Sequence, residues 1–175
     1  DSIMLFSTGL KNPKITMNNN LLNRISAKVN DIMLSLSKQI ISDGEGISKL
    51  IEVTVSNANN KTQASNVAFS IAESTLVKTA IAGEDANWGR IVMGIGKSQE
   101  NIAVNKLKIK IGNYSIVDAG QISEDYKTQE ENIREYMKWG SIDVEVDLKL
   151  GEAKHTVYTC DFTHDYIDIN ADYRN

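Results

Sequence analysis

The feature that most constrains the fold is a change in the spacing of apolar residues along the chain. Over residues 21–40 they recur every three or four positions, which is the period of an amphipathic helix. Over residues 50–56 the period falls to two, which is typical of a strand with one buried face. Asparagines at 18–20 are suited to cap the start of the helix. The Asp43-Gly44-Glu45-Gly46 segment is suited to end it, because glycine adopts the left-handed conformation of many helix ends.

The same alternation between helical and strand periods continues to the end of the chain. Further helices are expected at 64–72, 91–95 and 129–138, and further strands at 2–7, 106–111, 114–118, 142–150 and 154–161. Gly112-Asn113 is a hairpin turn signal between two of these strands. Strands interleaved with helices predict an α/β (α+β) fold, with a mixed sheet layered with helices. The sequence has no repeat and no evident linker, so we treat residues 1–175 as a single unit.

Composition and charge exclude several functional classes. The net charge is −4 and no basic stripe is present, which argues against nucleic-acid binding. No apolar stretch approaches the roughly 18 residues that indicate a membrane span. The single cysteine, Cys160, rules out an internal disulfide and is compatible with the reducing cytoplasm, where we expect the protein to act.

The residues themselves do not form a self-sufficient active site. The only histidines, His155 and His164, lack further ligands at metal-binding spacing, so no metal is expected. A catalytic role for Cys160 would need a positioned base, and a buried apolar cysteine is the commoner case. The glycine-rich stretch 83–96 matches neither common phosphate-binding fingerprint, and acidic Glu84 within it would repel a phosphate.

Two carboxylates on the loop between the first helix and its strand are the clearest candidate ligand groups. Asp43 and Glu45 lie beside glycines on this loop. Loops at strand ends often carry binding residues, and a carboxylate suits an ammonium ligand. An ordinary solvated helix terminus explains the same residues equally well. From the residues alone, both interpretations stay open.

Three separate stretches give the chain a family resemblance. They are Leu76–Arg90, which ends in Gly83-Glu84-Asp85-Ala86-Asn87-Trp88-Gly89-Arg90, the Asp43–Gly46 loop with the strand after it, and Tyr158–Arg174. In sequence, order and separation they resemble the glutamate N-acetyltransferase (ornithine acetyltransferase) family of arginine biosynthesis. The resemblance covers nearly the whole chain, and the run that ends at Arg90 is long and specific.

The resemblance implies a two-chain enzyme of α/β sandwich fold. In this family a precursor cleaves itself before a threonine, and the new N-terminal threonine is the nucleophile. It takes acetyl from N2-acetylornithine and passes it to glutamate, without a metal or prosthetic group. Some members also use acetyl-CoA to acetylate glutamate, and the resemblance alone leaves the use of acetyl-CoA by this protein open. The alpha chain from the same precursor is the expected partner, in an assembly of two alpha and two beta chains.

Carried over residue by residue, the resemblance gives this chain substrate contacts but no nucleophile. The chain corresponds to the C-terminal part of the beta chain, and the nucleophilic threonine is expected upstream. Glu45 matches a substrate-contacting glutamate, and Asn170 matches a C-terminal asparagine of the site. Asn175 stands where the family usually has serine or threonine, although its amide also donates and accepts hydrogen bonds. The alternative is a catalytically silent binding or structural module of the same fold.

Overall fold

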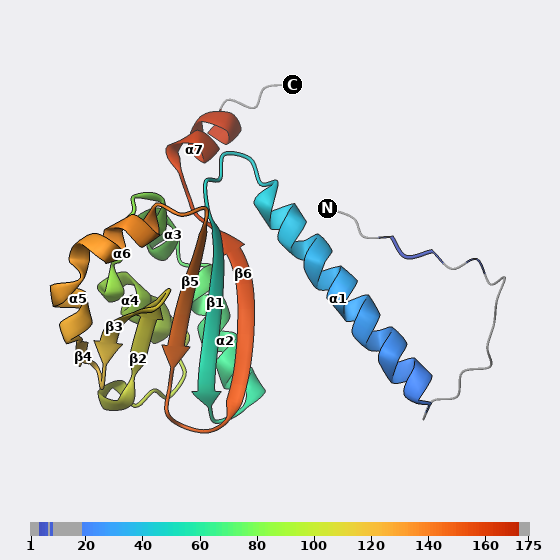
Figure 1. Cartoon of the computed structure of the whole chain (residues 1–175), viewed down its shortest axis with the longest axis horizontal. Helices are drawn as coiled ribbons and strands as arrows, with labels where there is room; N and C mark the ends of the chain where they lie inside the picture. The colour runs from blue at the N-terminus through green and yellow to red at the C-terminus, as the bar shows by residue number, and fades with distance from the viewer. Residues whose placement is uncertain (1–3, 7, 9–18, 172–175) are drawn as a thin grey trace. The chain divides into compact units, whose positions relative to one another are not determined.

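The computed structural model describes residues 4–6, 8 and 19–171 (Figure 1). It divides the chain into two compact units, Asp1–Gln39 and Ile40–Asn175. The sequence predicts a single unit. The boundary between the two units falls within the long helix, where no change in composition marks it. Residues 4–6 of the strand expected at 2–7 have no regular structure. The rest of that expected strand, and the loop around Pro13, lie outside the described residues.

The long helix predicted from the apolar period is confirmed as α1 (Asn20–Ser42). The Asn19 side chain caps its start, because its Oδ1 accepts a hydrogen bond from the backbone N–H of Leu21 at 2.9 Å. The helix ends immediately before the Asp43–Gly46 loop, as the sequence predicts. None of its residues is buried.

A six-stranded mixed sheet forms the centre of the second unit, with strand order β4-β3-β2-β5-β1-β6. The strands are β1 (Leu50–Ala58), β2 (Lys108–Ile111), β3 (Tyr114–Asp118), β4 (Gln121–Ile122), β5 (Ser141–Asp147) and β6 (Ala153–Cys160). Strand β1 runs parallel to β5 and antiparallel to β6, and the remaining pairs are antiparallel. In this register Leu50 lies opposite both Ser141 and Cys160. The start of β1, the start of β5 and the end of β6 therefore share one end of the sheet.

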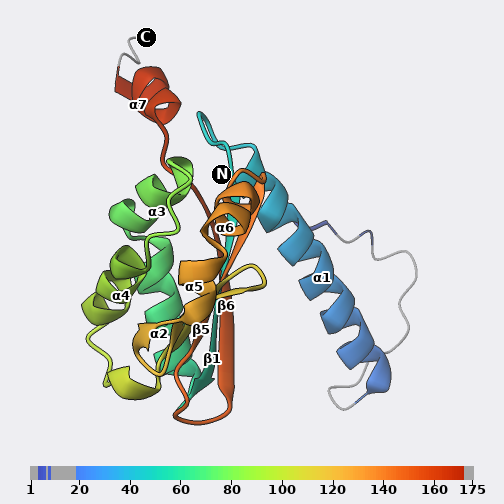
Figure 2. The same cartoon turned by 60° about the vertical axis from the view of Figure 1, so that its left-hand side comes forward.

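The hydrophobic core lies between one face of this sheet and the helices over residues 61–72, 75–82, 88–97 and 130–137. Alternate residues of β1, among them Ile51, Val53 and Val55, are fully buried, as their two-residue period predicts. Helix α2 (Lys61–Ala72) packs against β1 and β6, and α4 (Trp88–Lys97) packs against α2. Figure 2 shows α2, α3 (Thr75–Ala82) and α4 together on one side of the sheet. The predicted fold class is confirmed as a mixed sheet layered with helices.

Several elements were not predicted from the sequence. They are α3 (Thr75–Ala82), η1 (Val104–Lys106), α5 (Glu124–Thr128), α7 (His164–Ala171) and the short β4. The helix predicted at 129–138 is confirmed as α6 (Glu130–Met137). The strand predicted at 142–150 ends earlier, at Asp147, because the chain turns there and Lys149 has a φ of 54°. Helix α7 has no buried residue, so no apolar stripe marks it in the sequence.

Candidate functional site

The three stretches that carry the family resemblance meet at one end of the sheet. The backbone N–H of Asp161 donates to the carbonyl oxygen of Lys49 at 3.1 Å, and that of Phe162 donates to the carbonyl oxygen of Lys78 at 3.3 Å. The Lys49 ammonium lies 3.9 Å from a carboxylate oxygen of Glu84. Residues far apart in the sequence are thus joined where β1 begins and β6 ends. We take this end of the sheet as the candidate functional site.

Asp161 accepts three hydrogen bonds through its carboxylate at this end of the sheet. It is only 2% exposed. Its Oδ1 accepts hydrogen bonds from the backbone N–H groups of Ser48 at 2.9 Å and Lys49 at 3.0 Å, and its Oδ2 accepts a short bond from the Ser48 hydroxyl. A buried carboxylate is tolerated when such donors satisfy it, and these donors all come from the segment that follows the Asp43–Gly46 loop.

A second set of contacts holds the loop itself against helix α7. The Thr163 hydroxyl donates a short hydrogen bond to the Gly46 carbonyl and accepts one from the backbone N–H of Tyr166 at 3.3 Å. Gly46 has a φ of +67°, and a side chain there would overlap the backbone of Asp165 and Tyr166. We call the arrangement of Gly46, Ser48, Asp161 and Thr163 the loop–helix clamp.

The clamp joins the two elements that carry Glu45 and Asn170. Glu45 is exposed on the turn beside Gly46. Asn170 is exposed on α7, and its Nδ2 donates to the Tyr166 carbonyl at 2.9 Å. Because an α-helix rises about 1.5 Å per residue, Asn170 lies roughly 6 Å along the helix from the clamped first turn. Asn175, the third residue expected at the site, lies outside the described residues.

Lys49 is an unexpected member of this end of the sheet. Its side chain is only 6% exposed and faces Glu84, whose φ of 57° places it in the left-handed region. Sequence analysis did not single out Lys49, Ser48, Asp161 or Thr163. The available signal was a cluster of polar residues at the predicted start of one strand and the predicted end of another, but their pairing becomes visible only in the folded chain.

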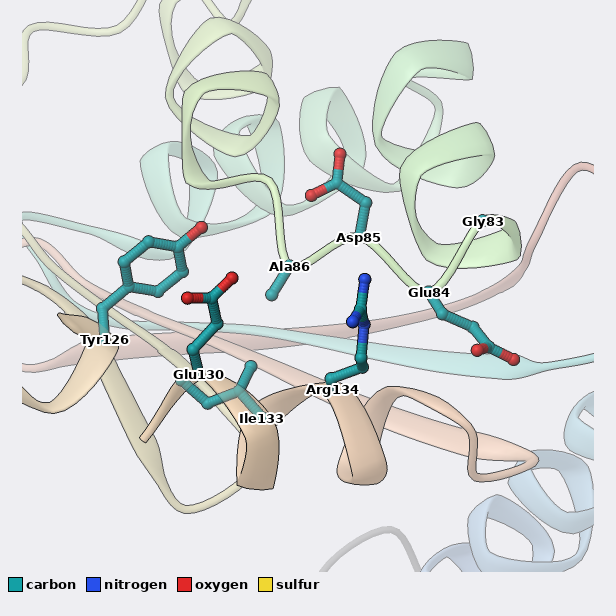
Figure 3. Close-up of a pocket in the computed structure, with 8 residues that line it drawn as sticks. All are labelled: Gly83, Glu84, Asp85, Ala86, Tyr126, Glu130, Ile133 and Arg134. Atoms are coloured by element: carbon teal, nitrogen blue, oxygen red, sulfur yellow. The ribbon is translucent and has the colours of Figure 1, made fainter. Parts of the chain in front are cut away.

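A cavity of about 290 Å³ lies between the Gly83–Ala86 loop and helices α5 and α6 (Figure 3). It is lined by Gly83, Glu84, Asp85, Ala86, Tyr126, Glu130, Ile133 and Arg134. Figure 3 shows the Arg134 side chain pointing from α6 toward the Gly83–Ala86 loop, with the Asp85 carboxylate turned away from the guanidinium. Burial raises the pKa of the Tyr126 phenol, and the charges of Asp85 and Glu130 raise it further. Three carboxylates against one guanidinium disfavour a phosphate here, in agreement with the sequence argument.

A second cavity of about 290 Å³ lies between helices α3 and α7. Its lining is mostly apolar and includes two threonines and one histidine: Thr79, Ala82, Gly83, Phe162, Thr163, His164 and Ile167. Gly83 lines this cavity and the first one. The clamp residue Thr163 therefore lines a cavity large enough for a small ligand.

The residues considered for metal or nucleophilic chemistry have other surroundings. His155 packs against the ring of Phe69, with 6.0 Å between ring centroids. Cys160 is a free, half-buried thiol on β6, rather than the fully buried one expected. Within the described ranges, no group of three or more histidine, cysteine or acidic residues could hold a metal ion. Among the helices the structure describes, none is long and apolar enough to cross a membrane.

Comparison with known proteins gives consistent matches along the chain. A family model described as the ArgJ family matches residues 1–175. The arginine biosynthesis bifunctional proteins ArgJ of Gluconobacter oxydans and Agrobacterium fabrum are 44% and 43% identical to the chain. These alignments cover 100% of this chain but only 41% and 43% of the relatives, so the chain spans less than half of their length.

A solved structure shows the same similarity in three dimensions. The crystal structure of the arginine biosynthesis bifunctional protein ArgJ from Bacillus halodurans superposes with a TM-score of 0.87 at 36% sequence identity. The match covers 93% of this chain and 75% of that chain. The similarity in three dimensions therefore extends over nearly the whole chain.

Proposed function

The chain belongs to the ArgJ family, and on this basis we propose that it is the C-terminal part of an acetyltransferase of arginine biosynthesis. In this proposal the enzyme moves acetyl from N2-acetylornithine to glutamate, and this chain supplies substrate contacts. The observation that carries the proposal is the loop–helix clamp. It holds the Glu45 loop against the first turn of the helix that bears Asn170, which supports a common site for two residues that are 125 positions apart in the sequence.

The side chains at this site suit amino-acid substrates. Ornithine and glutamate each present ammonium and carboxylate groups, which need an acceptor and a donor respectively. The exposed Glu45 carboxylate supplies the acceptor. The Asn170 amide has two N–H groups, and only one of them is needed for its bond to the Tyr166 carbonyl. The second N–H is available to a substrate carboxylate, and the Asn175 amide is proposed to act in the same way.

The proposed reaction transfers the acetyl group twice. The threonine hydroxyl oxygen, supplied from outside this chain, bonds to the acetyl carbonyl carbon. The carbon–nitrogen bond then breaks and ornithine leaves with the proton on its amine. The glutamate amine next attacks the ester carbonyl, which yields N-acetylglutamate and restores the threonine hydroxyl. Acetyl-CoA is a proposed alternative donor, and neither step calls on a metal or prosthetic group.

The partner in this proposal is the alpha chain of the same precursor, in an assembly of two alpha and two beta chains. The oxyanion donors belong to that alpha chain in the family. Because one such donor contributes about 10²–10³ in rate, this chain without its partner is expected to be inactive. We place the assembled enzyme in the cytoplasm.

The test is a kinetic comparison of Glu45→Gln and Asn170→Ala with the wild type in the assembled enzyme. A charge-assisted hydrogen bond contributes roughly 1.5–3 kcal/mol, so Glu45→Gln should lower kcat/KM about 10- to 150-fold. Asp43→Asn, on the same exposed loop, is the matched control and should have a much smaller effect. If Glu45→Gln and Asn170→Ala both keep wild-type kcat/KM for both substrates, the chain is a silent binding or structural module.

A further inference from the structure

We propose that Asp161 is a positioning residue of the substrate site, acting through Glu45. It contacts no substrate itself. It holds the Glu45 loop and helix α7 in one fixed arrangement, so that Glu45 and Asn170 reach a single small ligand together. This inference rests on the proposed function.

The first step is the position of Asp161 in the chain. It follows the last residue of β6, Cys160, and precedes the first residue of α7, His164, by three positions. A displacement of the Asp161 backbone is therefore expected to displace the start of the helix that bears Asn170. Its backbone N–H also donates to the Lys49 carbonyl at 3.1 Å, while its carboxylate accepts from the Lys49 N–H at 3.0 Å. Both the backbone and the side chain of Asp161 therefore form hydrogen bonds with Lys49.

The second step is how this contact reaches Glu45. The carboxylate of Asp161 fixes the backbone of Ser48 and Lys49, three and four residues beyond Glu45. On the near side, the Thr163 hydroxyl holds the Gly46 carbonyl, which belongs to the residue next to Glu45. The segment after Glu45 is therefore tied at two points to the joint between β6 and α7. The backbone of Glu45 has little freedom to move away from α7.

The third step is the energetic reason for such a device. Glutamate has its α-ammonium and α-carboxylate on one carbon atom, and N2-acetylornithine has its free ammonium at the end of a short side chain, so the groups that bind these substrates must lie within a limited separation of each other. Ordering them in advance reduces the entropy lost on binding. Glu45 is exposed on a turn and Asn170 is exposed on a helix with no buried residue. The clamp supplies the hydrogen bonds that fix these two elements relative to each other.

The alternative is that Asp161 only stabilises the fold. A purely structural role would reduce the amount of folded enzyme without changing the KM of the molecules that fold. Its effect would also multiply with that of a substitution at Glu45, because the two would act independently. A positioning role predicts instead that KM rises in the molecules that fold, and that the effects of the two substitutions do not multiply.

The test is a double-mutant cycle in the complete two-chain enzyme: wild type, Glu45→Gln, Asp161→Asn, and the two together. Rates are divided by the amount of enzyme that forms a covalent acetyl intermediate, so that unfolded protein does not contribute. Asp161→Asn should raise KM for glutamate and N-acetylornithine more than it lowers kcat. Its loss in kcat/KM should not exceed the roughly 10- to 150-fold expected for Glu45→Gln. The double variant should resemble Glu45→Gln alone.

Two further variants complete the experiment. One covers the case in which Asp161→Asn does not fold, and the other controls for replacing a hydrogen-bonded aspartate elsewhere in the sheet. Ser48→Ala removes one of the three hydrogen bonds to Asp161 and leaves both backbone bonds, so it should show a smaller effect of the same kind. If Asp161→Asn does not assemble, the cycle between Ser48→Ala and Glu45→Gln decides the question. Asp147→Asn is the matched control, because Asp147 also accepts two hydrogen bonds, but at the opposite end of the sheet. It should change KM by less than about twofold.

The outcomes separate the two proposals. If Glu45→Gln lowers kcat/KM and the effect of Asp161→Asn or Ser48→Ala multiplies with it, Asp161 is structural and the positioning proposal is overturned. Wild-type KM values in both Asp161→Asn and Ser48→Ala overturn it as well. If Glu45→Gln alone has no effect, Glu45 is not a substrate contact, and the proposed function at that residue fails together with the positioning role.

Discussion

Replacing Gly46 by alanine tests whether the loop–helix clamp is as tight as its geometry indicates. Gly46 has a φ of +67°, a conformation that costs a residue with a Cβ about 1–2 kcal/mol. The added Cβ would also overlap the backbone N of Tyr166 and would lie 2.6 Å from both the Asp165 carbonyl carbon and the Tyr166 Cα. Contacts between carbon atoms are favourable at about 3.5–4.0 Å, so the first turn of α7 must move by about 1 Å.

That movement breaks the hydrogen bond from the Thr163 hydroxyl to the Gly46 carbonyl, which contributes about 0.5–1.5 kcal/mol. Together with the backbone strain, the loss is about 1.5–3.5 kcal/mol. Because α7 has no buried residue, we expect the substitution to release this helix locally rather than to unfold the sheet. The amide hydrogens of α7 should then exchange roughly 10- to 400-fold faster.

Hydrogen exchange measured by mass spectrometry on the complete enzyme is the assay, with urea unfolding alongside it. Gly96→Ala is the control, because a Cβ added at Gly96 would meet no neighbouring atom within 4 Å and its helix should gain about 0.5–1 kcal/mol. Wild-type protection of α7 in Gly46→Ala would show that the helix is not held by this contact, and the reasoning would be refuted.

Two further predictions concern the sheet. Ile51→Ala should lower the free energy of unfolding by about 2–5 kcal/mol, because Ile51 is fully buried, whereas Ile122→Ala, at an exposed position, should change it by less than about 1 kcal/mol; denaturant titration measures both. Burial alone would raise the pKa of Asp147, but hydrogen bonds from Lys149 and Asn57 outweigh it and hold this pKa below its usual value. The stability that Asp147 contributes is therefore fully present above its unfolded-state pKa and is lost as the pH falls through its folded-state pKa. Asp147→Asn should flatten the acid side of the stability profile, and an unchanged profile would contradict this assignment.

The parts of the fold that could be predicted from sequence are those set by local periodicity. The three- and four-residue spacing that ends at Ile40 predicts α1, and the alternation around Val53 predicts β1, because each pattern reflects one buried face. Gly112-Asn113 predicts its hairpin for an equally local reason, the left-handed backbone at Gly112. Helix α7 was missed because residues such as Ile167 remain 47% exposed, so no buried face leaves a pattern.

The candidate site could be predicted only in part, because its binding residues and its supporting residues leave different signals. Glu45 and Asn170 were identified by resemblance to a family. Asp161 was not, because its importance depends on contacts with Ser48 and Lys49, which are more than a hundred residues earlier in the chain. The order of strands in the sheet brings them together, and that order is a property of the whole chain.

The central claim is that this chain contributes substrate contacts to an acetyltransferase whose nucleophile lies elsewhere in the protein. Mapping the acetyl-enzyme tests it most directly. The complete enzyme is incubated with N-acetylornithine, quenched in acid, digested, and analysed by mass spectrometry for the acetylated residue. The account predicts an acetyl ester on a threonine outside residues 1–175, which disappears when glutamate is added and forms more slowly in Glu45→Gln. An acetyl group on a residue of this chain, or an ester that forms equally fast in Glu45→Gln and persists with glutamate, would contradict it.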